Sequence, residues 1–261
     1  MNRLGKILQE LNNLECGTDN SSSLYHTDTR VKLITTLLFL ILMLSVPIYN
    51  LAHLILFVSY PIITCSLTGI KYFTIAKRSL VVLPFVLFIG LFNPILDTRP
   101  MYIIANFHIS AGWISFFSII LRGIIATQAV LVLIYSSGFQ RICNALRQLG
   151  VPNLLVTQLL LVYRYTFVLL QETMSMHRAR LSRSFGKGSY KMKTWGVFVG
   201  QLFLRTTIHS TKIYQAMLAR GFSGKIIVHN TSRWTIKDTL YLIIMSTGLI
   251  CLKFINFNTI S

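Results

Sequence analysis

The chain has 261 residues, of which 53% are hydrophobic and 12% are charged, with a mean hydropathy of +0.62. A soluble globular domain carries about 25% charged residues, so this composition excludes an ordinary water-soluble protein and indicates an integral membrane protein. The 25 Lys and Arg residues far exceed the 7 Asp and Glu residues, which gives a formal net charge of +18. This charge suits anionic lipid or an acidic partner. Nucleic acid is not an expected partner, because the long apolar runs leave no soluble reader domain.

The chain begins with a polar segment over 1–31, which does not match a cleaved secretory signal. Five apolar runs follow, each long enough to cross a bilayer as a helix. They are 33–49, 51–68, 79–96, 112–136 and 235–257. We therefore predict an all-α, polytopic membrane protein with about five transmembrane helices and long cytoplasmic helices. The predicted divisions are a polar segment over 1–31, a membrane domain with four spans over 32–136, a cytoplasmic region over 137–232 and a C-terminal span over 233–261.

Basic residues accumulate in the cytoplasmic loops of membrane proteins, so their distribution predicts an orientation. Arg30 and Lys32 precede the first run, whereas the turn near Pro47 carries no basic residue. The pattern predicts a multi-pass protein of the inner (cytoplasmic) membrane, with its N-terminus and residues 137–232 in the cytoplasm. The apolar stretch 154–170 is expected to lie along or dip into the inner face, because a crossing would carry many basic residues outside. A re-entrant or fully spanning stretch is the alternative and would give six spans.

The region from Arg141 to Lys225 carries 13 basic residues and a single acidic residue, Glu172. Gly and Pro residues, which stop helices, divide this region into three predicted helices. These cover about 138–148, 154–184 and 193–220. The second helix ends in ARLSRSF at 179–185 and the third in AMLARGF at 216–222, so both read Ala-x-x-small-Arg-small-Phe. The Ala and the Arg of each motif are four residues apart and share one helix face.

An Arg in the last turn of a helix is favourable against the helix dipole, and capping alone explains one such motif. The small residues around each Arg would also let another backbone approach. A guanidinium can then donate in a fixed fork to carbonyls or carboxylates. Two matched copies therefore favour docking of a partner over capping. The predicted docking residues are Ala179, Ser182, Arg183, Ser184, Ala216, Ala219, Arg220 and Gly221.

The paired motifs, at 182–184 and 219–221, resemble the signature of the T components of energy-coupling factor transporters. The chain resembles the cobalt-type CbiQ branch most, and the resemblance extends over nearly the whole chain. Further matching stretches are DTRVKL at 28–33, LFNP at 91–94, ALRQLGVP at 145–152, YRY at 163–165, LFLR at 202–205 and AMLARGFSG at 216–224. The chain departs from the family pattern at Ser184, where Gly is often found, and at Thr29, where Pro is usual.

The resemblance implies a non-catalytic coupling subunit of an energy-coupling factor ABC importer, with no cofactor in this chain. Two coupling helices would cross, and Arg183 and Arg220 would each dock into one of two ABC-type ATPase subunits. Closing of the ATPases would then move a membrane S component that binds the substrate. The implied cargo is cobalt, with nickel or a vitamin as alternatives. Gly196 and Gly200 could let the coupling helices cross closely, although ordinary packing explains their spacing equally well.

Other residues give weaker signals. The sequence has no G-x-x-x-x-G-K-[ST] loop, so separate ATPases are expected. No spacing of His or Cys residues suggests a metal site, and we expect the S component to bind the ion. Arg122 lies inside the fourth run, where it pairs with a carbonyl or a partner subunit, or faces protein within the bundle. Glu172 is expected to pair within its own helix, with Arg164 or Arg180.

Two other functions remain as alternatives for a basic polytopic chain. A membrane-embedded enzyme acting on a phosphorylated lipid would need carboxylates for metal or acid–base chemistry, and the cytoplasmic region has one. A self-contained secondary transporter would show inverted repeats and broken helices at mid-membrane, whereas the repeat found here lies outside the predicted spans. Copurification of ATPases separates both alternatives from a coupling subunit.

Overall fold

The computed structural model of the chain describes residues 27–48, 50–96, 100–104, 107–183, 192–224 and 235–254. Within these ranges the chain is helical apart from one short β-hairpin, which confirms the predicted all-α class. The chain divides into two compact units. We call residues 27–145 together with 235–254 the bundle unit, and residues 146–224 the helix-pair unit.

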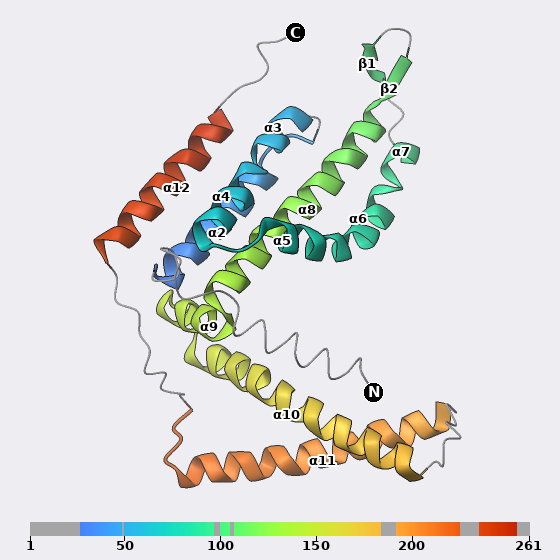
Figure 1. Ribbon diagram of the computed structural model, residues 1–261, viewed down its shortest axis with the longest axis vertical. Coiled ribbons are helices and arrows are strands. Elements are labelled where there is room, and N and C mark those ends of the chain that lie inside the picture. Colours follow the sequence, from blue (N-terminus) through green and yellow to red (C-terminus); the bar gives the residue numbers. More distant parts are fainter. Residues whose placement is uncertain are drawn as a thin grey trace. The chain divides into compact units, whose positions relative to one another are not determined.

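The bundle unit is arranged around one long helix, α8, which contacts each helix from α2 to α7 (Figure 1). Its elements are α2 (Thr29–Leu44), α3 (Leu51–Leu56), α4 (Ser59–Thr68), α5 (Tyr72–Ser79), the 3-10 helix η2 (Leu80–Val82), α6 (Leu83–Gly90), α7 (Asn93–Leu96), β1 (Pro100–Ile104), β2 (Phe107–Ser110), α8 (Ala111–Ser137) and α12 (Ile236–Phe254). β1 and β2 pair antiparallel, with Ile104 opposite Phe107. The helix α9 (Phe139–Gln148) leads from the bundle unit into the helix-pair unit.

The predicted apolar runs correspond to helices, but several are shorter or broken. The fourth run matches α8 to within one residue at each end. In contrast, α2 ends at Leu44, the second run forms α3 and α4, and the third run is divided among α5 to α7. Proline has no backbone N–H, so it is tolerated in the first turn of a helix and disfavoured further inside. Pro61, Pro84 and Pro94 each fall in such a first turn, where α4, α6 and α7 begin.

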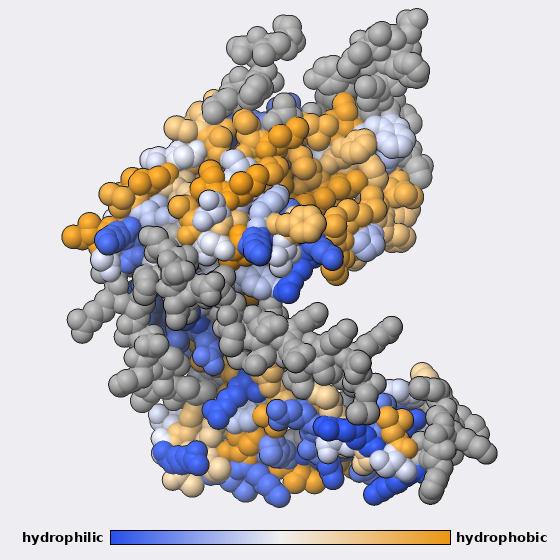
Figure 2. All heavy atoms as spheres, in the orientation of Figure 1, coloured by the Kyte–Doolittle hydropathy of each residue, from blue (hydrophilic) through white to orange (hydrophobic). Residues whose placement is uncertain are grey.

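The surface of the bundle unit is apolar. Leu44 on α2 is 64% exposed and Phe88 on α6 is 68% exposed, and orange apolar residues cover much of this unit in Figure 2. Among the described residues, three helical stretches are long and apolar enough to cross a membrane, namely Tyr72–Gly90, Gly112–Ser137 and Asn153–Arg183. Such surfaces require lipid around them, so the chain is a membrane-embedded protein. The total of five spans stays a prediction.

The core of the bundle unit lies where α2, α3, α4, α8 and α12 meet. The rings of Phe39 on α2 and Tyr60 on α4 are stacked, with centroids 4.1 Å apart. The buried cluster comprises Phe39, Met43, Val46, Leu54, Phe57, Tyr60, Ile125, Ala129 and Leu249. On another side of α8, a Cβ placed on Gly123 would lie 2.8 Å from Cγ2 of Val86. This glycine therefore lets α6 approach α8 closely, as small residues do between membrane helices.

The helices α2 and α12 run in the same direction and are joined at both ends. The backbone N–H of Asp28 donates to Oδ1 of Asp238 at 2.9 Å, and the N–H of Thr235 donates to Oδ2 at 2.8 Å. Asp238 is only 3% exposed, and its carboxylate satisfies free N–H groups at the starts of both helices. At the other end, Nζ of Lys253 donates to Oγ of Ser45 at 3.0 Å.

We predict that the substitution Asp238→Asn lowers the stability of the chain. An amide offers one acceptor oxygen where the carboxylate offers two, so a buried N–H loses its charged partner, at a cost of about 1–3 kcal/mol. The measurement is the apparent Tm of the purified chain in detergent. The control is Lys237→Asn, which changes an exposed neighbour. Equal Tm values for the two variants would show that the carboxylate does not join these helices.

Candidate docking site

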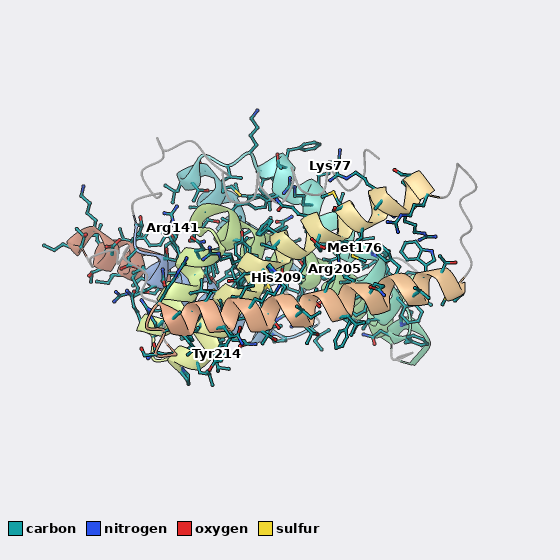
Figure 3. The ribbon with its side chains drawn as sticks, turned by 90° about the horizontal axis from the view of Figure 1, so that it is seen from below. Lys77, Arg141, Met176, Arg205, His209 and Tyr214 are labelled. Carbon is teal, nitrogen blue, oxygen red and sulfur yellow. The ribbon has the colours of Figure 1, made fainter. Side chains whose placement is uncertain are left out.

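The candidate site is carried by the two long helices of the helix-pair unit, α10 (Asn153–Arg183) and α11 (Met192–Ala219). Their bounds lie within one residue of the predicted 154–184 and 193–220, which confirms both helices. The two helices are antiparallel: Glu172 pairs with Arg205, and Arg180, later in α10, pairs with an earlier residue of α11, Trp195 (Figures 1 and 3).

The antiparallel arrangement separates the two arginine motifs. Arg183 is the last residue of α10, and Arg220 follows directly after the last residue of α11. The 28 residues of α11 span about 40 Å at the rise of an α-helix. The two arginines therefore lie at opposite ends of the helix pair, and both are exposed.

The backbone around Arg220 is fixed by a well-formed helix end. The N–H of Phe222 donates to the carbonyl of Met217 at 3.0 Å, and the N–H of Gly221 donates to the carbonyl of Leu218 at 2.9 Å. Gly221 has a φ of +80°, in the left-handed region that favours glycine. The predicted glycine after this Arg thus has a clear structural role, because it ends the helix immediately beyond the guanidinium.

The first motif has a similar exposed end. Ala179, Ser182 and Arg183 are exposed, as are Ala216 and Ala219 in the second motif. Ser182 donates its hydroxyl to the carbonyl of Arg178 at 3.2 Å, so this side chain folds back on its own helix. Ser184, also predicted to dock, lies outside the described residues.

Neither of the two arginines predicted to dock has a partner in the part of the chain that the structure describes. The guanidinium groups of Arg183 and Arg220 make no hydrogen bond or ion pair there, whereas Arg180 and Arg205 on the same helices are engaged. Each carries small, exposed neighbours, so a partner backbone can come close to the helix end. A free guanidinium in such a place can donate two parallel hydrogen bonds to a carboxylate, or single bonds to carbonyls.

The glycines predicted to allow a close helix crossing are exposed. A Cβ placed on Gly196 or Gly200 would meet no atom within 4 Å among the described residues. Within the helix pair, contact is instead made by long side chains reaching across from both helices. A close crossing at these two glycines stays a prediction.

The predicted partner of Glu172 was wrong. Arg164 and Arg180 are each eight residues away along α10, about 12 Å by the helical rise, which is too far for an ordinary intrahelical pair. The carboxylate instead pairs with Arg205 on α11. His209 lines the groove beside this pair, and Figure 3 shows both of these α11 residues where the two helices pass one another. Sequence alone could not find this pair, because it depends on the antiparallel register.

Arg122 is half-buried in the bundle unit and pairs with backbone carbonyls there, which is one of the roles that the sequence left open. Its Nη2 donates to the carbonyl of Val46 at 2.6 Å, and its Nη1 lies 3.4 Å from the carbonyl of Leu44. Both carbonyls are at the end of α2, where the helix leaves its acceptors free. Arg122 therefore satisfies the end of a neighbouring helix.

Metal-ligating side chains do not gather in the described ranges, where no three His, Cys, Asp or Glu residues come together. Cys143 on α9 is buried, and this burial raises the pKa of its thiol, so the side chain stays protonated at neutral pH. That the cargo ion binds to a different subunit stays a prediction.

Comparisons with known proteins show the family to which this chain is similar. A family model described as CbiQ, cobalt transport protein, matches residues 20–232. An uncharacterized protein of Methanocaldococcus jannaschii is 30% identical over an alignment of 262 positions, and this alignment covers 95% of this chain and 88% of that protein. The cobalt transport protein CbiQ of Salmonella typhimurium is 32% identical over 104 residues, 36% of this chain and 46% of that protein. The nickel permease LarQ of Lactiplantibacillus plantarum is 28% identical over 104 residues, covering 40% and 38%.

We predict that Gly221→Ala frays the end of α11. A side chain in the left-handed conformation costs about 1–2 kcal/mol, so the last turn opens more often. Hydrogen–deuterium exchange of the amides at 217–222 measures this, and we expect it to rise about tenfold, as 1.4 kcal/mol implies. The matched control is Gly200→Ala, which lies inside the helix with open space around it and should leave this exchange unchanged. Equal exchange in both variants would contradict the assigned role of Gly221.

Proposed function

The chain belongs to the CbiQ family of cobalt transport proteins, and we propose that it is the T component of an energy-coupling factor ABC importer. In this role it would be non-catalytic and would transmit movements of partner ATPases to a membrane S component. The observation that carries the proposal is the placement of Arg183 and Arg220. Two exposed arginines, with no partner among the described residues, lie at opposite ends of an antiparallel helix pair.

This placement suits two copies of an ABC-type ATPase. Each copy would receive one arginine, whose guanidinium donates to carbonyls or carboxylates on the ATPase surface. Because α10 and α11 are joined through Glu172 and Arg205, a displacement of either end is passed to the other helix. Movement of the two ATPases towards or away from one another would therefore displace both helices of the pair.

Charge distribution supports an orientation in which the N-terminus and residues 137–232 face the cytoplasm, where ATP is available. The helix α10 is long and apolar enough to cross a membrane. However, a crossing would place its terminal arginine motif on the side opposite to its start. Docking of both motifs to ATPases instead requires that the two ends of the helix pair lie on the cytoplasmic side.

For the cargo we propose cobalt. The family carries cobalt in its description, and a relative of 32% identity over 104 residues is the cobalt transport protein CbiQ. Nickel is the second candidate, because another relative is the nickel permease LarQ. Uptake of each ion by cells that express the complete importer, with the other ion as competitor, distinguishes the two.

We predict that reversing both docking charges, with Arg183→Glu and Arg220→Glu together, abolishes copurification of the ATPases while the chain still inserts into the membrane. The reversed side chains would repel the acceptor groups that the arginines bind. The measurement is the amount of ATPase recovered with the tagged chain from detergent-solubilised membranes.

The matched control is Arg178→Glu, which reverses another exposed arginine five residues before Arg183 and about 140° around the helix from it. This control should retain the ATPases. Recovery of ATPases with the double variant at the wild-type level would overturn the docking assignment.

A further inference from the structure

The region that contains the helix pair is strongly basic, so its two helices have little opportunity to attract one another through charge. Glu172 is the single acidic residue between Arg141 and Lys225, against 13 basic residues in the same interval. Cations on two facing helices repel one another, and the repulsion is screened but not removed by salt. The ion pair of Glu172 with Arg205 is therefore the one attraction between opposite formal charges that this interval can supply.

The contacts between α10 and α11 differ on the two sides of the ion pair of Glu172 with Arg205. On one side, the guanidinium of Arg180 lies over the ring of Trp195, 5.3 Å from its centroid. On the other side, α10 and α11 stand apart along an open groove. Its walls include Leu161, Tyr165 and Leu169 of α10 and Ile213, Tyr214 and Met217 of α11. Along the two helices, the ion pair therefore lies between the contact of Arg180 with Trp195 and the residues that line this groove.

The pair also selects one register between the helices. A shift of one helical turn, about 5.4 Å, would move Glu172 from Arg205 to Gln201 or His209. Beyond His209, the next lysine or arginine of α11 is Lys212, which lies two turns from Arg205 and carries no ion pair in the described residues. A single charged residue that finds its partner in only one alignment fixes register, as polar residues do in coiled coils.

We propose that Glu172 and Arg205 are positioning residues that set the register of α10 against α11. They thereby hold the two docking arginines, Arg183 and Arg220, at the separation that two ATPase subunits require. The side chains of the pair are 39% and 60% exposed, so the pair adds little to the stability of the fold. Its loss should disturb the spacing of the helix ends and leave the chain folded. The inference rests on the proposed function.

The experiment measures the separation directly, in the full-length chain reconstituted in lipid nanodiscs. Spin labels carried by unnatural amino acids replace Leu181 and Leu218, two exposed residues near the docking ends, expected roughly 35 Å apart from the helical rise. We expect a narrow distance distribution for the otherwise wild-type chain and a broad or displaced one for Glu172→Arg. The reciprocal exchange, Glu172→Arg with Arg205→Glu, should restore the narrow distribution. Lys212→Ala, which removes another exposed cation of α11 close to the ion pair, should behave as wild type.

A functional measurement accompanies the distances. In cells expressing the complete importer, Glu172→Arg should lower uptake of radiolabelled cobalt by about tenfold, and the reciprocal exchange should recover most of it, as expected for two coupled charges. The inference is overturned if Glu172→Arg leaves the distance distribution and uptake unchanged, or if the reciprocal exchange restores neither. If instead no ATPase copurifies with the wild-type chain, the proposed function itself fails, so the two failures are distinguishable.

Discussion

Scarcity of carboxylates is the constraint on which both units of this protein depend. The chain has 7 acidic residues against 25 basic ones, and two of the described carboxylates join helices to one another. Asp238 accepts from the starts of α2 and α12, and Glu172 accepts from Arg205 across the helix pair. Because most other charged groups are cations that repel one another, each of these two carboxylates supplies an attraction between helices that few other side chains of the chain can supply.

Cations take a complementary role at the opposite ends of helices. Arg122 donates to carbonyls at the end of α2, and Lys253 bonds Ser45 just beyond it. In lipid, a backbone carbonyl without a partner is costly, so a charged side chain from a neighbouring helix is a favourable solution. Arg183 and Arg220 differ in having no such partner among the described residues. This contrast with Arg122 and Lys253 supports a role for Arg183 and Arg220 in binding another protein.

The sequence was most informative about the helix-pair unit. Glycine stops set the helix bounds to within one residue, and Gly221, with its φ of +80°, shows why such stops are reliable. The repeated motif likewise predicted two exposed arginines. The partner of Glu172 could not be predicted, because a contact between distant residues depends on the antiparallel register. In the bundle unit, hydropathy located the apolar runs but not their interruptions, since α2 ends before Pro47 and other prolines start new short helices.

The proposed role of this chain is to couple partner ATPases to a substrate-binding membrane protein. The most direct measurement is affinity purification of the tagged chain from native membranes, followed by mass spectrometry of everything that copurifies. We expect recovery of one or two kinds of ABC-type ATPase subunit together with a small hydrophobic membrane protein, whose identity would indicate the cargo. Recovery of the chain alone, in detergent that preserves control importers of the same class, would show that the chain is not such a coupling subunit.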